Sequence, residues 1–149
     1  MNEKLKGKVA IVTGSGRGLG KAFVISMVKQ GIEVCIAEID KNLGQDVKIL
    51  MNSSGVRVEY FHTDVSDENS VKACCDFVRS QFGRVDILIN NAGIAYNSKI
   101  EDINLRKLKK SFEVNLFAPV VFLKETLKVM KKNNYGRIIN VSSGGAVNC

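Results

Sequence analysis

The glycine-rich segment at residues 13–20 constrains the fold of this chain more than any other feature. It follows an apolar run at residues 9–12 and precedes a pattern of apolar residues at helical spacing. A strand, a glycine turn and a helix in that order form a cradle for phosphate, because the N–H groups and the positive dipole end of the helix face the anion. The segment therefore predicts a nucleotide-binding turn near the amino terminus.

The length and composition are those of one ordinary globular domain. The chain has 149 residues, of which 45% are hydrophobic and 25% are charged, and it contains a single proline. We therefore expect one domain over residues 1–149. No apolar stretch reaches the roughly 20 residues that span a bilayer, and no apolar signal segment follows the first residues. These features predict a cytoplasmic protein.

The net charge of +7 raises the question of a nucleic-acid or membrane partner. Apolar residues interleave the clustered lysines at helical spacing, which is typical of a solvated helix face. We therefore expect neither nucleic acid nor membrane as a partner. The clustered lysines are Lys107, Lys109, Lys110, Lys124, Lys128, Lys131 and Lys132.

The four cysteines indicate neither a disulfide framework nor a metal site. Cys35 lies in an apolar run, Cys74 and Cys75 are neighbours, and Cys149 ends the chain. No Cys-x-x-Cys pair occurs and His62 is the single histidine, so we expect no bound metal. Reduced cysteines that pack in the core fit this pattern.

Strand and helix patterns alternate along the chain. The expected strands are continuous apolar runs, which is typical of parallel strands buried on both faces. Five strands alternating with four helices predict an α/β fold, a Rossmann-like doubly wound parallel sheet that binds ligands beyond the carboxyl ends of its strands. We expect strands at residues 8–13, 33–38, 56–62, 85–90 and 137–142, and helices at residues 18–30, 41–52, 66–82 and 105–132.

Two local signals predict finer detail. Ser66 stands just before acidic residues and is the candidate N-cap of the third helix. Pro119 lies inside the fourth helical stretch, where proline removes a hydrogen bond and displaces the carbonyl four residues earlier. That carbonyl belongs to Asn115, so we expect a kink there and a backbone group available to another partner.

The spacing of the glycines excludes two nucleotide-binding motifs. A G-x-G-x-x-G motif counted from Gly14 would need a glycine where Leu19 stands. A Walker A loop needs a hydroxyl side chain after its Gly-Lys pair, and here Gly20 and Lys21 are followed by Ala22.

Two other interpretations of the glycines fit better. Glycines at positions 14, 16 and 18 also match the triplet of S-adenosylmethionine-dependent methyltransferases. Those enzymes carry an acidic residue two positions before the first glycine, where this chain has Val12. The pattern Thr13-Gly14-x-x-x-Gly18-x-Gly20 fits a different family of nucleotide-binding proteins without a mismatch.

A second set of residues decides between these interpretations. Asp64 and Val65 follow the third strand, Asn-Asn-Ala-Gly at residues 90–93 ends the fourth, Asn115 lies at the expected kink, and Ser143 ends the fifth strand. In this order the chain resembles the short-chain dehydrogenase/reductase family of NAD(P)-dependent oxidoreductases over essentially its whole length. The resemblance implies hydride transfer between nicotinamide and a small-molecule carbonyl or alcohol substrate. A methyltransferase is kept as a remote alternative.

The resemblance implies a cofactor site with three parts. The glycine turn lets the backbone approach the pyrophosphate, the end of the third strand binds the adenine amino group, and residues 91–93 line the adenosine ribose. Structural alternatives stay open, since Asp64 could cap the next turn and Asn91 could bridge neighbouring strands. The implied cofactor-binding residues are Gly14, Ser15, Arg17, Gly18, Leu19, Gly20, Glu38, Asp64, Val65, Asn91, Ala92 and Gly93.

Glu38 at the end of the second strand predicts NAD rather than NADP as the cofactor. A carboxylate there accepts hydrogen bonds from the ribose hydroxyls and repels a 2′-phosphate. Arg17 in the glycine turn keeps NADP as the alternative, since a guanidinium can bind that phosphate.

The resemblance also implies two catalytic residues. Asn115 would hold a water of the proton relay, and Ser143 would bind the substrate oxygen. Structurally, Asn115 could only satisfy the kinked backbone and Ser143 could only end its strand. The family's catalytic Tyr-x-x-x-Lys motif is expected more than ten residues beyond Ser143, past Cys149.

None of the three tyrosines replaces that motif, because Asp64, Ile100 and Ile139 stand four residues after them. We therefore expect a C-terminally incomplete sheet, a chain that is inactive alone, and a parent enzyme that forms a homo-oligomer. A truncated protein that binds NAD(P) without catalysis is the alternative.

Overall fold

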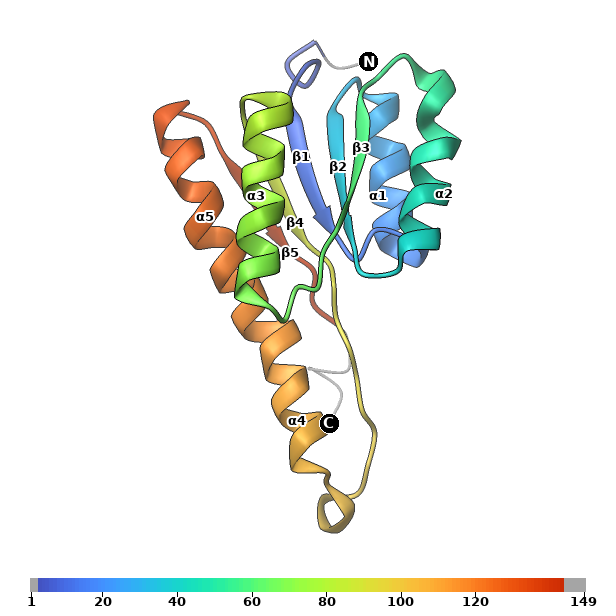
Figure 1. The fold of residues 1–149 in the computed structure, drawn as a ribbon, viewed down its shortest axis with the longest axis vertical. Helices are drawn as coiled ribbons and strands as arrows, with labels where there is room; N and C mark the ends of the chain where they lie inside the picture. The colour runs from blue at the N-terminus through green and yellow to red at the C-terminus, as the bar shows by residue number, and fades with distance from the viewer. Residues whose placement is uncertain (1–2, 144–149) are drawn as a thin grey trace.

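A parallel five-stranded sheet with the order β3-β2-β1-β4-β5 lies at the centre of the computed structural model, which describes residues 3–143 (Figure 1). All four neighbouring pairs of strands are parallel. The predicted Rossmann-like fold is therefore confirmed. The strands are β1 (Val9–Thr13), β2 (Glu33–Glu38), β3 (Val58–His62), β4 (Ile87–Asn90) and β5 (Arg137–Asn140).

Helices cover both faces of this sheet. Two helices lie on one face, α1 (Gly18–Lys29) and α2 (Lys41–Met51), and α3 (Glu68–Phe82) and α5 (Ala118–Lys132) lie on the other. Short 3-10 helices occupy Asn52–Ser54 and Ile100–Asp102. Within residues 3–143, no helix combines the length and the apolar character needed to cross a membrane.

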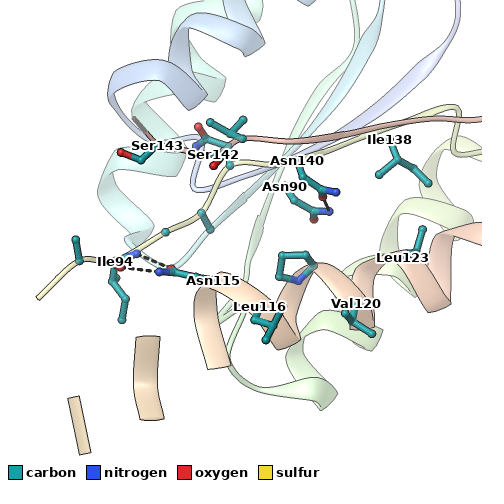
Figure 2. Close-up of a pocket in the computed structure, with 16 residues that line it drawn as sticks. Asn90, Ile94, Asn115, Leu116, Val120, Leu123, Ile138, Asn140, Ser142 and Ser143 are labelled. Carbon is teal, nitrogen blue, oxygen red and sulfur yellow. Dashed lines mark hydrogen bonds between the residues drawn. The ribbon is translucent and has the colours of Figure 1, made fainter. Parts of the chain in front are cut away.

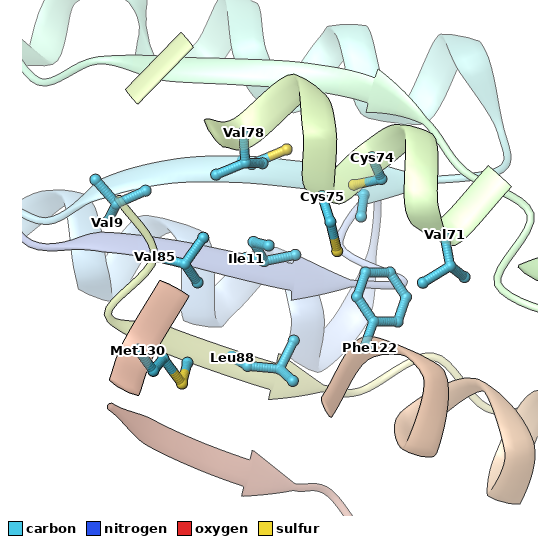
Figure 3. Close-up of a cluster of buried hydrophobic side chains, with 12 residues drawn as sticks. Val9, Ile11, Val71, Cys74, Cys75, Val78, Val85, Leu88, Phe122 and Met130 are labelled. Carbon is cyan, nitrogen blue, oxygen red and sulfur yellow. The ribbon is translucent and has the colours of Figure 1, made fainter. Parts of the chain in front are cut away.

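The central strand β1 is buried completely because its side chains alternate between two cores. Val9 and Ile11 pack with the side chains of α3 and α5, among them Val78 and Phe122 (Figure 3). The intervening residues of β1 pack with α1 and α2 in the second core. Burial on both faces explains why this strand is a continuous apolar run in the sequence.

The three cysteines in the described part of the chain are free and buried, as the sequence predicted. Cys35 comes from β2, and Cys74 and Cys75 come from α3. Burial raises the pKa of Cys75 to about 12, so this thiol is protonated and inert at neutral pH. Cys149 lies outside the described residues.

The long helical stretch contains the predicted interruption at Asn115. Helix α4 (Leu105–Phe112) passes into a π-helical segment at Glu113–Phe117, and α5 follows. Pro119 lies four residues after Asn115, just past the point where the π-helical segment ends.

One predicted detail is wrong. The N-cap of α3 is Asp67, whose carboxylate accepts a hydrogen bond from the backbone N–H of Asn69. Ser66 instead donates its hydroxyl proton to Asp64. Serine and aspartate are both good N-caps. Here the Ser66 hydroxyl is hydrogen-bonded to Asp64, and the Asp67 carboxylate caps the helix.

Candidate functional site

A cavity of about 440 Å³ opens at the carboxyl ends of β1 to β4, the edge where parallel α/β sheets bind ligands. Ten of the twelve residues predicted to bind a cofactor line it, and Ser15 and Gly18 do not. The ten are Gly14, Arg17, Leu19, Gly20, Glu38, Asp64, Val65, Asn91, Ala92 and Gly93. Segments far apart in the sequence therefore meet at one place.

The glycine turn has a backbone that only glycine adopts easily. Gly14 and Gly18 have φ angles of +60° and +53°. A Cβ atom at Gly20 would lie 2.3 Å from the carbonyl oxygen of Gly14, and one at Gly14 would lie 2.8 Å from the Cα of Ala92. Side chains at these positions would push the turn away from α1 and β4.

Ser15 and Gly18 serve the turn without lining the cavity. The buried hydroxyl of Ser15 donates to the carbonyl of Val12, so only its backbone faces the turn. A Cβ atom at Gly18 would meet no atom within 4 Å. Its positive φ angle therefore explains this glycine, and the open space beside it lies at the start of α1.

Asn91 holds the ends of β1 and β4 together. Its side-chain N–H donates to the carbonyls of Thr13 and Gly14, both at 3.0 Å. In return, the hydroxyl oxygen of Thr13 accepts from the backbone N–H groups of Asn91 at 2.9 Å and Ala92 at 3.0 Å. The structural interpretation of Asn91 as a bridge between strands therefore holds, and Asn91 lines the cavity as well.

Glu38 connects the end of β2 to the glycine turn. One of its carboxylate oxygens accepts from the backbone N–H of Gly16 at 2.8 Å, and the other accepts from Ile39 and Asp40. A Cβ atom at Gly16 would lie 2.7 Å from Leu43, so only glycine allows the turn to come this close to Glu38. A carboxylate has about four acceptor positions, so one remains for a ligand.

Asp64 lies at the end of β3 in a tight turn. Its oxygen Oδ1 accepts from the backbone N–H of Ser66 at 2.9 Å and from the Ser66 hydroxyl at 2.6 Å. Burial favours the neutral acid, but these hydrogen bonds and the positive charge of Lys110 outweigh it, so the pKa of Asp64 is lowered. Asp64 is therefore an ionised acceptor at neutral pH.

A second pocket, of about 730 Å³, contains the predicted catalytic residues Asn115 and Ser143 (Figure 2). Among the described residues it is lined by the ends of β4 and β5 and by the start of α5. The side chain of Asn115 accepts from the backbone N–H of Ile94 at 2.9 Å and donates to its carbonyl at 2.8 Å. Asn115 thus ties the π-helical segment to the chain after β4.

Sequence reasoning missed two residues of the glycine turn and its surroundings, Thr13 and Gly16. Thr13 is a hydroxyl residue at the end of a buried strand, directly before the first glycine. That position was visible in the sequence, but its partners lie 78 and 79 residues away. Gly16 was assigned only to a competing motif, and its role depends on contact with Glu38 and Leu43.

The chain matches a known family over most of its length. The family profile described as "short chain dehydrogenase" matches residues 8–148. Zerumbone synthase of Zingiber zerumbet is 32% identical over 146 residues, which cover 97% of this chain and 54% of that protein. Xanthoxin dehydrogenase of Arabidopsis thaliana is 34% identical, with 98% of this chain and 53% of that protein covered. The chain spans about half the length of these curated relatives.

Solved structures show the same likeness. NAD+-bound xylitol dehydrogenase superposes with a TM-score of 0.93 at 27% identity, covering 98% of this chain and 56% of that one. A 7α-hydroxysteroid dehydrogenase complexed with NADH and 7-oxo glycochenodeoxycholic acid superposes with a TM-score of 0.94 at 29% identity, covering 100% and 60%.

Proposed function

Because the chain belongs to the short-chain dehydrogenase family, we propose that it binds a nicotinamide dinucleotide in the 440 Å³ cavity. We propose further that the chain takes part in hydride transfer between nicotinamide and a carbonyl or alcohol substrate. One observation carries the first proposal. Gly14, which has a positive φ angle, and Gly20 in the first turn of α1 share a cavity with the carboxylates of Glu38 and Asp64.

Each part of a dinucleotide has a matching group in this cavity. The pyrophosphate would lie at the start of α1, beside Leu19 and Gly20, where the helix dipole and the N–H groups of the first turn favour an anion. The adenine amino group would donate to Asp64, and the adenosine ribose would lie against residues 91–93. The cavity lining supports these assignments.

We propose NAD rather than NADP as the cofactor. Glu38 keeps one acceptor position and a negative charge at the end of β2, which favours ribose hydroxyls over a 2′-phosphate. Arg17 also lines the cavity and is the group that would reduce this preference.

Catalysis is proposed to begin with Ser143 and Asn115, which line one pocket. Ser143 would bind the substrate oxygen, and Asn115 would hold a water near it. Bound nicotinamide supplies or accepts the hydride, but the alkoxide that forms on a carbonyl still needs a proton. Neither side chain is a proton donor of suitable pKa, since a serine hydroxyl needs a base and an amide does not titrate.

The 149-residue chain by itself is therefore proposed to bind the cofactor without turnover. General acid–base assistance contributes about 10²- to 10⁴-fold to such reactions. An NADH oxidation assay with a panel of ketones and aldehydes tests this. A rate above that of a Ser143→Ala variant would show that another residue of this chain supplies the proton, and the proposal would be wrong.

Cofactor binding is tested by titrating the chain with NADH and with S-adenosylmethionine. We expect enhanced NADH fluorescence on binding and a dissociation constant at least tenfold lower for NADH. Tighter binding of S-adenosylmethionine would favour the methyltransferase interpretation of the glycine turn. No binding of either ligand would overturn the assignment of the cavity.

We also propose that the protein pairs with a second copy of itself through α4 and α5. Exposed apolar side chains follow one another along these helices, including Phe112, Leu116 and Val120 at 50–55% exposure. An apolar stripe of this kind is typical of an interface. Sedimentation equilibrium is expected to show a dimer, and Phe112→Ser with Val120→Ser is expected to shift it to monomer.

A further inference from the structure

A hydrogen-bonded chain of three residues connects α4 to the end of β3. The ammonium group of Lys110 donates to the hydroxyl oxygen of Ser66, 44 residues earlier in the sequence. The Ser66 hydroxyl in turn donates to Oδ1 of Asp64 at 2.6 Å. Lys110 also approaches the carboxylate of Glu113, three residues later, at 3.9 Å.

Chemistry decides the direction of these bonds. An ammonium group can only donate, and a hydroxyl has a single proton, so Ser66 accepts from Lys110 and gives its proton to Asp64. Both hydrogen bonds to the Asp64 carboxylate within residues 3–143 go to Oδ1. The lone pairs of Oδ2 are thereby left for another donor.

The position of the three residues relative to the cavity is equally informative. Asp64 and Lys110 line it, and Ser66 is not among the described residues that do. Ser66 therefore contacts both of these cavity-lining residues without lining the cavity itself. Helix α4 has no buried residue, so Lys110 supplies one of its few connections to this end of the site.

We propose that Lys110, acting through Ser66, is a positioning residue that orients Asp64 toward the amino group of an adenine base. The inference rests on the proposed function. An ionised carboxylate accepts hydrogen bonds and cannot donate them, so it favours the 6-amino group of adenine and repels the 6-oxo group of hypoxanthine. Lys110 and Ser66 would thus contribute to the choice of base without touching it.

The experiment compares NADH with its deamino analogue, in which hypoxanthine replaces adenine, on the full 149-residue chain. Lys110→Met and Ser66→Ala are expected to weaken NADH binding about 3- to 10-fold, in the range of one charge-assisted hydrogen bond. Both should leave the deamino analogue within about twofold. The double variant should bind NADH no more weakly than Ser66→Ala, because both changes break one chain of contacts.

Two controls separate positioning from folding. Lys109→Met removes the neighbouring charge on α4 and should leave both affinities unchanged, since successive helical residues point about 100° apart. Lys110→Arg should restore much of the preference for NADH. Circular dichroism and urea unfolding check that each variant is folded.

The possible results are distinct. Equal loss of both dinucleotides in Lys110→Met, or no loss of either, would overturn the positioning role while leaving the cofactor site in place. If the unmodified chain binds neither dinucleotide, the proposed function itself is wrong.

Discussion

Strands β1 and β5 lie in the same sheet, yet their surroundings are opposite. Every residue of β1 is buried, whereas every residue of β5 is exposed. The neighbouring strand β4 shows the same contrast with β5. Ile89 of β4 is 1% exposed, and its register partner Ile139 of β5 is 47% exposed. Composition alone does not explain this, because the two isoleucines of β5 are exposed as well as its polar residues.

The difference comes from what covers each strand. Two strands flank β1 and helices cover both of its faces, but within the described chain β5 has one neighbouring strand. The cavity proposed for the cofactor lies at the ends of β1 to β4, and the pocket of Asn115 and Ser143 borders β5. Binding is thus expected to depend on the more stable part of the molecule.

The largest expected effect is a difference in stability loss between alanine variants of two register partners, Ile89 and Ile139. Ile89→Ala should lower the free energy of unfolding by about 2–5 kcal/mol, because it opens a cavity in a closed core. Ile139→Ala should cost about 1 kcal/mol or less, because half of that side chain is already in water. Urea unfolding of both variants measures the difference. Equal losses would show that β5 is covered in solution.

The next effect concerns the glycine turn. Gly20→Ala should cost about 1–3 kcal/mol, since its Cβ would overlap the carbonyl of Gly14, and should weaken NADH binding more than tenfold. Gly55→Ala is the matched control, with φ of +70° and no atom within 4 Å of the added carbon. It should lose about 1–2 kcal/mol from its backbone alone. Its NADH affinity should be unchanged, and a comparable loss there would point to general destabilisation.

A smaller effect is expected from the carboxylate at the end of β2. Glu38→Gln should weaken NAD binding about tenfold and NADP binding less, because the neutral amide removes the charge that repels a 2′-phosphate. The backbone N–H of Gly16 would keep an oxygen partner in this variant. Calorimetric titration with both cofactors measures the ratio. A chain that prefers NADP before mutation would contradict the role of Glu38.

The smallest effect is a pH dependence of the folding stability, and it comes from the amino-terminal end of β4, opposite the cavity. Asp86 lies just before β4, and its burial by itself would raise its pKa. It accepts hydrogen bonds from Arg84 and from the backbone N–H of Val9, and the charge of Lys8 is nearby. These interactions outweigh burial and lower the pKa of Asp86. The folded pKa thus lies below the unfolded value of about 3.9. Its stabilising contribution is present above that value and is lost as the pH falls through the folded pKa.

Unfolding measured between pH 7 and pH 2 tests this. Asp86→Asn should show a shallower loss of stability below about pH 4 than the unmodified chain. The exposed Asp46→Asn is the control and should follow the unmodified curve. If the stability of Asp86→Asn falls with pH in parallel with that of the unmodified chain, Asp86 does not contribute to the loss of stability in acid.

Much of the site was visible in the sequence because its residues follow strands at the same edge. Gly14, Glu38, Asp64 and Asn91 each come directly after or at the end of a strand, and parallel strands bring these ends together. Thr13 and Lys110 were not assigned to the site. Each acts through partners more than 40 residues away, and no local pattern reports such a contact.

The sequence alone determined the order of strands and helices, the glycine turn and the family. These follow from periodicity and from backbone angles that few residues tolerate, which are local properties. Only the structure showed that Asp67 caps α3 and that Ser66 lies between Lys110 and Asp64. It also decided that β1 is buried and β5 exposed, because burial depends on which elements cover a strand and not on the strand itself.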